Sequence, residues 1–344
     1  MILKEEQQKT SHPLAKKRMI LLITLPIILI IVSIGSLMIG QVSFSVGEVF
    51  QGIFSSEDTL ARRIVWEIRM PRILIGIVVG ICLAIAGAML QGIMQNPLAD
   101  PGVIGITSGA GVMAVLVMIV FPGYILFLPI AAFTGAFVAA MIVYTLSVKK
   151  SGTSPTRIVL VGVAVNAICG AATNMMMILY SDRVQAVLPW LSGGLMGVGW
   201  VQFESIIYYV VVALILAVYG IKHIRIMRLG DEMARLLGHN VERSRLFLIV
   251  VSTLLAGLAV SVAGLVGFIG LVVPHMIRLL IGGDFRYLIP ASAIGGGLLV
   301  VFADTIARSV FNPIEIPVGI LLAFIGGPYF LYLIHRKGNS IAAN

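Results

Sequence analysis

Charged residues are the scarcest feature of this sequence. Only 11% of its 344 residues are Asp, Glu, Lys or Arg, whereas 59% are apolar, and the mean hydropathy is +1.06. A soluble globular domain carries about 25% charged residues. Long apolar runs cross lipid as helices, because a helix bonds all its backbone polar groups internally. The composition excludes an ordinary soluble domain and predicts an all-α, polytopic membrane protein.

Cysteine and the common catalytic motifs are also scarce or missing. The two cysteines, Cys82 and Cys169, lie in apolar runs and are too few for a disulfide framework or a metal cluster. The sequence contains neither a GxxxxGK[ST] phosphate-binding loop nor an HExxH zinc motif, and its five histidines are not paired at metal-ligand spacing. We therefore expect no enzyme activity, no metal and no cofactor.

Carboxylates are missing from the middle of the apolar runs. Asp100, Asp182 and Asp304 lie at or near predicted helix ends, and residues 101–146 carry no charge. Ion-driven carriers usually place a carboxylate in mid-membrane. This absence disfavours an ion-coupled secondary transporter, although a sodium site built from backbone carbonyls would leave no such trace.

Apolar runs of about 20 residues, the length that crosses a bilayer as a helix, fill most of the chain. Seven are clear: Met19–Gly40, Ile73–Met94, Val103–Phe121, Ile125–Val148, Ile158–Tyr180, Ser205–Ile221 and Ile316–Ile334. In residues 246–281 we expect a helix that ends near Gly267 and a short broken one across Pro274. Another span covers residues 287–310. The pattern predicts about ten transmembrane helices.

Basic residues set the expected orientation. Five Lys and Arg precede the first span, which predicts a cytoplasmic N-terminus. We expect a cytoplasmic tail at 1–18, one transmembrane domain at 19–336 and a cytoplasmic tail at 337–344. The net charge of +9 fits an inner face against anionic membrane lipid and needs no nucleic acid. Six arginines remain outside: Arg62, Arg63, Arg69, Arg72, Arg183 and Arg308.

One polar segment, RLGDEMARLLGHN at 228–240, interrupts the apolar runs. Its acidic start suits a helix N-terminus and Gly238 suits a C-terminal cap. Met233, Leu236 and Leu237 form a small apolar side. So short a helix must dock on something to be stable. The segment is either a plain cytoplasmic loop or a plug for a soluble partner.

Two other sites carry turn or helix-break signals. In QNPLADPG, Asn96 can bond backbone groups, while Pro97 and Pro101 forbid a continuing helix after Asn96 and Asp100. In GFIGLVVPHMIR, Pro274 interrupts the helix, and His275 is expected to form structural hydrogen bonds at a helix end. These residues predict structural turns.

Several motifs, in order, resemble the FecCD family of permease subunits of ATP-binding-cassette (ABC) importers for iron-siderophores, haem and cobalamin. The resemblance covers about residues 41–328. The motifs are IRMPRIL (68–74), GAMLQGIMQNPLADPGVIGITSGAG (87–111), PWLSGGLMGVGW (189–200), LGDEMARLLG (229–238), GLVGFIGLVVPHMIRLLIGGDFR (264–286), ADTIAR (303–308) and PVGILLAFIGGPYF (317–330). Together they imply a type II importer permease in the bacterial cytoplasmic membrane.

The resemblance also implies partners and roles. Cytoplasmic ATP-binding subunits would supply the energy, a substrate-binding protein would dock outside, and a second permease would complete a dimer. The residues implied in coupling to the ATPase are Asp231, Glu232, Met233, Ala234, Arg235, Leu236, Leu237 and Gly238. Arg69, Arg72 and Arg308 match the docking arginines; alternatively they bind lipid phosphates or pair with Glu67 and Asp304. Asn166, Asn174, Met175 and Met176 are implied in lining the cavity.

The ligand is a ferric siderophore by the weight of the family, with haem or cobalamin as the alternative. Two alternatives belong to other functional classes. One is a receptor-like membrane protein that binds a ligand without uptake, and the other is an ion-coupled secondary transporter.

Overall fold

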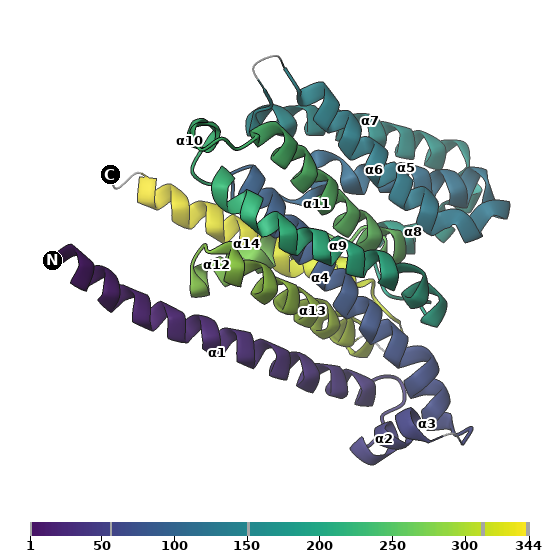
Figure 1. Cartoon of the computed structure of the whole chain (residues 1–344). Coiled ribbons are helices and arrows are strands. Elements are labelled where there is room, and N and C mark those ends of the chain that lie inside the picture. The colour runs from purple at the N-terminus through teal and green to yellow at the C-terminus, as the bar shows by residue number, and fades with distance from the viewer. Residues whose placement is uncertain (1, 56, 150–151, 311–313, 342–344) are drawn as a thin grey trace.

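The protein is described by a computed structural model that covers residues 2–55, 57–149, 152–310 and 314–341. Within these ranges the chain is helical and contains no strand, which confirms the all-α prediction. The long helices are α1 (Ile2–Met38), α4 (Met70–Ile93), α6 (Leu128–Ser147), α7 (Pro155–Leu179), α9 (Trp200–Met227), α11 (Val241–Ala263), α13 (Phe285–Ser309) and α14 (Val318–Ile341). Figure 1 shows them packed as one bundle.

Shorter elements connect the long helices. The short α-helices are α2 (Val46–Phe54), α3 (Leu60–Arg62), α5 (Ile106–Val115), α8 (Val184–Ser192), α10 (Asp231–Leu236) and α12 (Ile269–Ile281). The π and 3-10 segments are η1 (Arg63–Arg69), η2 (Pro101–Ile104), η3 (Leu116–Val120), η4 (Pro122–Phe127) and η5 (Ser181–Arg183). In the described part of the chain, seven helical stretches are long and apolar enough to span a membrane, and three shorter apolar helices accompany them. About ten spans agrees with the sequence prediction.

The helix that was predicted to end near Gly267 ends earlier in the chain. Helix α11 ends at Ala263, and Gly264 turns the chain with φ +67°. A Cβ there would lie 2.2 Å from the carbonyl oxygen of Trp190, so only glycine allows the turn at this point. Pro274 does not interrupt the helix, because it lies inside α12. The predicted break at Pro274 is therefore wrong.

The two segments predicted as cytoplasmic tails are largely helical in the structure. Helix α1 begins at Ile2, so most of the segment 1–18 continues the first span as helix. At the other end α14 continues to Ile341. Residues 1 and 342–344 lie outside the described ranges. Hydropathy did not reveal α2, which starts with a reciprocal cap between Ser45 and Glu48.

Helix α4 is the centre of the bundle. It contacts α9, α11, α12 and α13, and 83% of its most apolar window is buried, against 17% for α1 and for α7. Glycines permit the closest approaches: a Cβ on Gly87 would lie 1.9 Å from the Gly270 oxygen, and one on Gly80 would lie 2.2 Å from the Gly296 oxygen. Small residues drive helix packing in lipid in this way.

The two ends of the bundle differ in content. In Figure 1 both termini, α10 and α12 lie toward one end, on the left, whereas α2 and α3 lie at the opposite end. We call these the α10 end and the α2 end. The predicted coupling segment is at the first of them, and Arg69, which follows α3, is at the second.

Candidate functional site

The segment predicted to couple to an ATPase forms a separate short helix, α10. Gly230 precedes it with φ +92°, and Gly238 follows it with φ +76°. The N–H groups of Gly238 and His239 donate to the carbonyls of Arg235 and Ala234, at 2.9 and 3.0 Å. This paired arrangement closes the C-terminus of a helix and requires a left-handed residue, which Gly238 supplies. The two glycines thus define both ends of α10.

One side of α10 is fixed to the bundle. Asp231 accepts two hydrogen bonds from the guanidinium of Arg245, at 2.8 and 2.9 Å. Arg245 lies on α11 and its side chain is 1% exposed; it also donates to the carbonyl and the hydroxyl of Thr153, at 2.6 and 2.8 Å. The side chain of Ala234 is fully buried. A charge-assisted pair, in which one guanidinium nitrogen of Arg245 donates to both carboxylate oxygens of Asp231, therefore sets the orientation of α10.

The other side of α10 is apolar and exposed. The exposed fractions of Met233, Leu236 and Leu237 are 50%, 82% and 63%. Glu232 is exposed as well, and Arg235 lies 3.9 Å from Glu242. A helix this short does not hold three large apolar side chains in water for stability, because they bury almost nothing. This face is therefore an exposed apolar surface of the chain.

The turn after α4 lies at the same end of the bundle. The Asn96 side-chain oxygen accepts the Leu98 N–H at 3.0 Å, and the Asp100 carboxylate caps η2 by accepting the Gly102 N–H at 2.8 Å. Burial raises the pKa of the Asp100 carboxyl above its usual range, and the hydrogen bond from Gly102 opposes that shift. Pro101 opens η2. The turn is thus held by side chains of its own residues.

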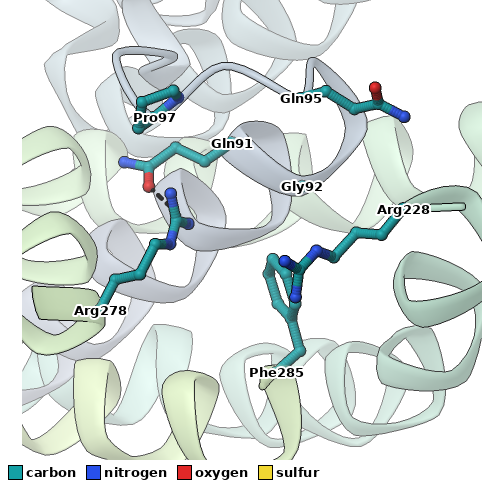
Figure 2. A pocket seen from close by; sticks show the side chains of 7 residues that line it. All are labelled: Gln91, Gly92, Gln95, Pro97, Arg228, Arg278 and Phe285. Atoms are coloured by element: carbon teal, nitrogen blue, oxygen red, sulfur yellow. Dashed lines mark hydrogen bonds between the residues drawn. The ribbon is translucent and has the colours of Figure 1, made fainter. Parts of the chain in front are cut away.

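A cavity of about 230 Å³ opens beside this turn. Figure 2 shows its lining residues, which come from α4, the turn, α9, α12 and α13: Gln91, Gly92, Gln95, Pro97, Arg228, Arg278 and Phe285. Of these, the sequence singled out only Pro97. Arg228 and Arg278 were simply counted among the basic residues of the inner face, and no local pattern places them together.

The three arginines predicted to dock a binding protein lie together at the α2 end. Arg69, Arg72 and Arg308 line one hollow of about 170 Å³ that also includes Glu315. Arg72 holds Asp304 through two hydrogen bonds of 2.9 Å and Glu315 through one of 2.8 Å. Pairing of Arg72 with Asp304 is the alternative that the sequence had left open. Glu315 carried no sequence signal.

Arg69 and Arg308 bond mainly to neutral groups. Arg69 donates to the carbonyl of Leu37 at 2.5 Å and to that of Val42. Arg308 donates to the carbonyl and hydroxyl oxygens of Ser36, and lies 3.9 Å from Asp304. Arg69 and Arg308 are 5% and 7% exposed. All three arginines therefore have acceptors within the chain already.

The four residues expected to line a cavity divide between two sides of α7. Asn166 donates to the Gly102 carbonyl at 2.9 Å and pairs with the Ser108 hydroxyl at 2.5 Å, so it holds α7 against η2 and α5. Met176 packs in an apolar cluster with residues of η3 and α8. Asn174 and Met175 lie on the exposed side of α7. Of the four, these two are the most exposed.

Pro274 and His275 lie within α12, and His275 is buried. Pro274 has no N–H for the Gly270 carbonyl, one turn before it. Gln91 of α4 takes that role and donates to the Gly270 oxygen at 3.1 Å. Among the residues that the structure describes, no group of three or more His, Cys, Asp or Glu could hold a metal ion.

Comparison with known proteins decides the family. The model of the FecCD transport family matches residues 28–336. The chain belongs to the FecCD transport family. Fe(3+)-citrate import system permease protein YfmE of Bacillus subtilis is 39% identical over 320 residues, covering 93% of this chain and 96% of that protein. Hemin transport system permease protein HmuU of Yersinia pestis is 38% identical, covering 90% and 94%.

A solved structure supports the same conclusion. An inward-facing metal-chelate type ABC transporter superposes with a TM-score of 0.81 at 27% identity, and the match covers 92% of this chain and 98% of that one. This FecCD member is therefore a membrane-embedded ABC importer permease of the metal-chelate type. Such a permease implies an ATPase and a second permease as partners.

Proposed function

We propose that this FecCD permease imports a ferric siderophore by alternating access, driven by a separate ATP-binding subunit. The observation that supports energy input from a separate subunit is the arrangement of α10. Its apolar face is exposed, and its other side is held by the buried Arg245. The chain itself hydrolyses nothing in this scheme. Relatives named for iron-citrate and for hemin support an iron chelate as cargo. Haem and cobalamin are the alternatives.

Helix α10 would transmit the ATPase stroke. A groove in the partner would enclose Met233, Leu236 and Leu237, because burying them removes large apolar side chains from water. Force applied there would pass through the Asp231–Arg245 pair to α11 and through Arg245 to Thr153. Both α10 and the termini would then lie on the cytoplasmic side of the bacterial cell membrane.

The arginine hollow at the α2 end would receive the binding protein outside. Three guanidinium groups, of Arg69, Arg72 and Arg308, face two carboxylates, of Asp304 and Glu315, which leaves one positive charge. A glutamate from the partner would neutralise it. Internal acceptors already bind the arginines. Docking would therefore require the partner's glutamate to replace an internal carboxylate as the acceptor of an arginine in the hollow. The exposed residues Asn174 and Met175 of α7 would line the pathway in a permease dimer.

Uptake of labelled iron complexes tests the cargo. Cells that lack the gene and cells that carry it are compared for a ferric siderophore, ferric citrate, hemin and cobalamin. We expect restored uptake of the siderophore alone or foremost. Restored uptake of hemin or cobalamin instead would transfer the proposal to that ligand. Uptake by the chain alone in ion-loaded vesicles, without an ATPase, would identify a secondary transporter.

A gain of affinity tests the docking hollow. Glu315→Gln removes one internal competitor of Arg72 and raises the net charge of the hollow, so we expect tighter binding-protein docking. A misfolded variant cannot bind more tightly, so the direction of the effect separates docking from damage. Arg63→Gln is the matched control, since Arg63 lies at the same end on an exposed pair with Asp58. Unchanged or weaker docking by Glu315→Gln would contradict this site.

A further inference from the structure

Two arginines at the α10 end have no carboxylate partner. Arg228 follows α9 and Arg278 lies on α12, and neither takes part in any ion pair among the described residues. Arg286, close by in sequence, pairs with Asp284 at 2.7 Å, and that guanidinium holds the pKa of the Asp284 carboxyl below its usual range. Asp284, the acidic residue nearest to Arg278 in the sequence, is therefore already paired, and Asp231, the one nearest to Arg228, pairs with Arg245.

Neutral acceptors hold both guanidinium groups in place. Arg228 donates to the Gly283 carbonyl at 2.5 Å and lies 5.7 Å from the centre of the Phe285 ring. A Cβ on Gly283 would approach the Arg228 guanidinium to 3.3 Å, so the glycine leaves room for it. Arg278 donates to the side-chain oxygen of Gln91 at 3.0 Å. Neither contact neutralises a charge.

Gln91 is itself fixed by the backbone of α12. It is 2% exposed, and its amide nitrogen donates to the carbonyls of Gly270 and Leu271, at 3.1 and 3.3 Å. The first carbonyl is available because Pro274 has no N–H to offer it. These donations turn the amide oxygen of Gln91 toward Arg278. The Arg278 guanidinium is thus positioned in advance, through a chain of contacts that begins at Pro274.

The space between the two arginines is open. In Figure 2 their guanidinium groups extend toward the centre of the cavity from opposite sides. The cavity has a volume of about 230 Å³, several times the roughly 30 Å³ that one water takes up in the liquid. A tetrahedral oxyanion and a few waters fit that volume. Two uncompensated, pre-positioned guanidinium forks are the arrangement that binds phosphate oxygens most strongly.

We propose that this cavity binds a phosphate group between Arg228 and Arg278. An anionic lipid headgroup and a soluble phosphate share this chemistry, and the surroundings favour the lipid. Leu279 and Leu280, next to Arg278 in α12, are 64% and 54% exposed and offer a surface for acyl chains. Arg18 of α1 donates to the Ile281 carbonyl at 3.0 Å and adds a further positive charge nearby. Basic pockets between transmembrane helices bind lipid headgroups in this way.

A bound phosphate would add a further link between α4 and two helices that already contact it, α9 and α12. Arg228 lies two residues before Gly230, which starts α10, while Gln91 belongs to α4 and Arg278 to α12. The anion would link the base of α10 to the central helix. This goes beyond the proposed import of an iron chelate, because lipid composition would then tune the stability of the coupling end.

Lipid retention tests the proposal on the full chain. The protein is placed in nanodiscs of phosphatidylcholine with or without phosphatidylglycerol, and retained lipid is counted by native mass spectrometry. Inorganic phosphate and pyrophosphate are titrated in the phosphatidylcholine discs by calorimetry. We expect Arg228→Gln and Arg278→Gln each to weaken binding about fivefold, as the loss of one basic contact to an anionic headgroup predicts. Arg286→Gln is the matched control and leaves binding unchanged.

Gln91→Leu separates positioning from charge. It keeps both arginines but removes the acceptor of Arg278, so we expect weaker lipid binding at unchanged net charge. Phosphatidylglycerol retention that depends on both arginines supports the lipid source, and calorimetric binding of free phosphate with the same dependence supports the soluble one. Equal retention and equal phosphate binding by the wild type and the double variant Arg228→Gln/Arg278→Gln would overturn the proposal. Loss of ATPase-subunit binding alone would overturn it too and assign the cavity to a protein contact.

Discussion

Arg72 at one end of this bundle and Arg228 and Arg278 at the other are held by different kinds of partner. At the α2 end, Arg72 is bound by two carboxylates in a buried setting. At the α10 end, Arg228 and Arg278 are bound by a carbonyl and an amide, and their charges remain uncompensated. Charge that is balanced within the chain stabilises the fold, whereas positioned charge without a counter-ion is available to a partner. The contrast separates a closed network from an open one.

Helix α10 combines both arrangements in a few residues. Its Asp231 belongs to a closed pair with the buried Arg245, while Leu236 and Leu237 are exposed. One face thus stabilises the fold, and the other is the face that we propose binds the ATPase. Substitutions at the two ends should therefore affect stability and function to different degrees.

The largest effect on stability is expected from Asp304→Asn. This carboxylate is 5% exposed and faces both Arg72, at 2.9 Å, and Arg308, at 3.9 Å. Removing one partner of a buried ion pair costs about 3–5 kcal/mol, and here it leaves Glu315 as the remaining carboxylate beside three guanidinium groups. Thermal unfolding of the purified protein in detergent measures the loss. Asp58→Asn, at an exposed pair of the same end, is the control and should leave the midpoint unchanged.

A midpoint for Asp304→Asn equal to that of the wild type would contradict the closed network. A second substitution, which removes the opposite charge, tests whether the two side chains act as a pair. Asp304→Asn combined with Arg72→Gln removes both charges of the pair, so we expect part of the lost stability to return. Additive losses in the double variant would mean that the two side chains do not act as a pair.

An intermediate effect is expected from Asp231→Asn. The buried Arg245 keeps Glu242 at 3.4 Å and Thr153 as further partners, so it is not left without an acceptor. Loss of one charge-assisted contact of this kind costs about 1.5–3 kcal/mol. Because α10 then loses its orientation, ATPase-driven uptake should fall more than ATP hydrolysis. Unfolding midpoints measure the loss of stability, and the ratio of uptake to ATP hydrolysis measures the loss of coupling. An unchanged ratio would argue against α10 as the coupling element.

The smallest effect on stability, and a large one on function, is expected from Leu236→Asp. Surface changes of this kind stay within about 0.5 kcal/mol, and the Leu236 side chain is 82% exposed. Its charge would nevertheless oppose burial in a partner groove, so binding of the ATPase subunit should weaken. Leu229→Asp is a matched control, since Leu229 is exposed just before α10. Equal binding by both variants and the wild type would refute the contact face.

Much of the fold could be predicted from the sequence because it depends on local properties. Apolar runs of span length predicted the helices, and the polar interruption with its two glycines predicted a short helix at residues 231–238. The errors lie where contacts overrule the local signal. Pro274 was expected to break its helix, but Gln91, 183 residues away in sequence, takes up the carbonyl that the proline leaves free.

The site shows the same division. Motif order brought Arg69, Arg72 and Arg308 forward, and the structure places them in one hollow. Their burial and their pairing with Glu315 and Ser36 could not be predicted, because those partners lie on distant segments without a sequence signal.

The sequence by itself determined that this chain is a helical membrane permease, because hydropathy and motif order are properties of the chain alone. Only the tertiary structure decided which charges are compensated. Arg72 and Arg278 both lie beside apolar runs in the sequence, yet Arg72 binds Asp304 whereas Arg278 binds Gln91. The energy of a charge depends on what lies within a few ångströms of it, and that is fixed by helix packing.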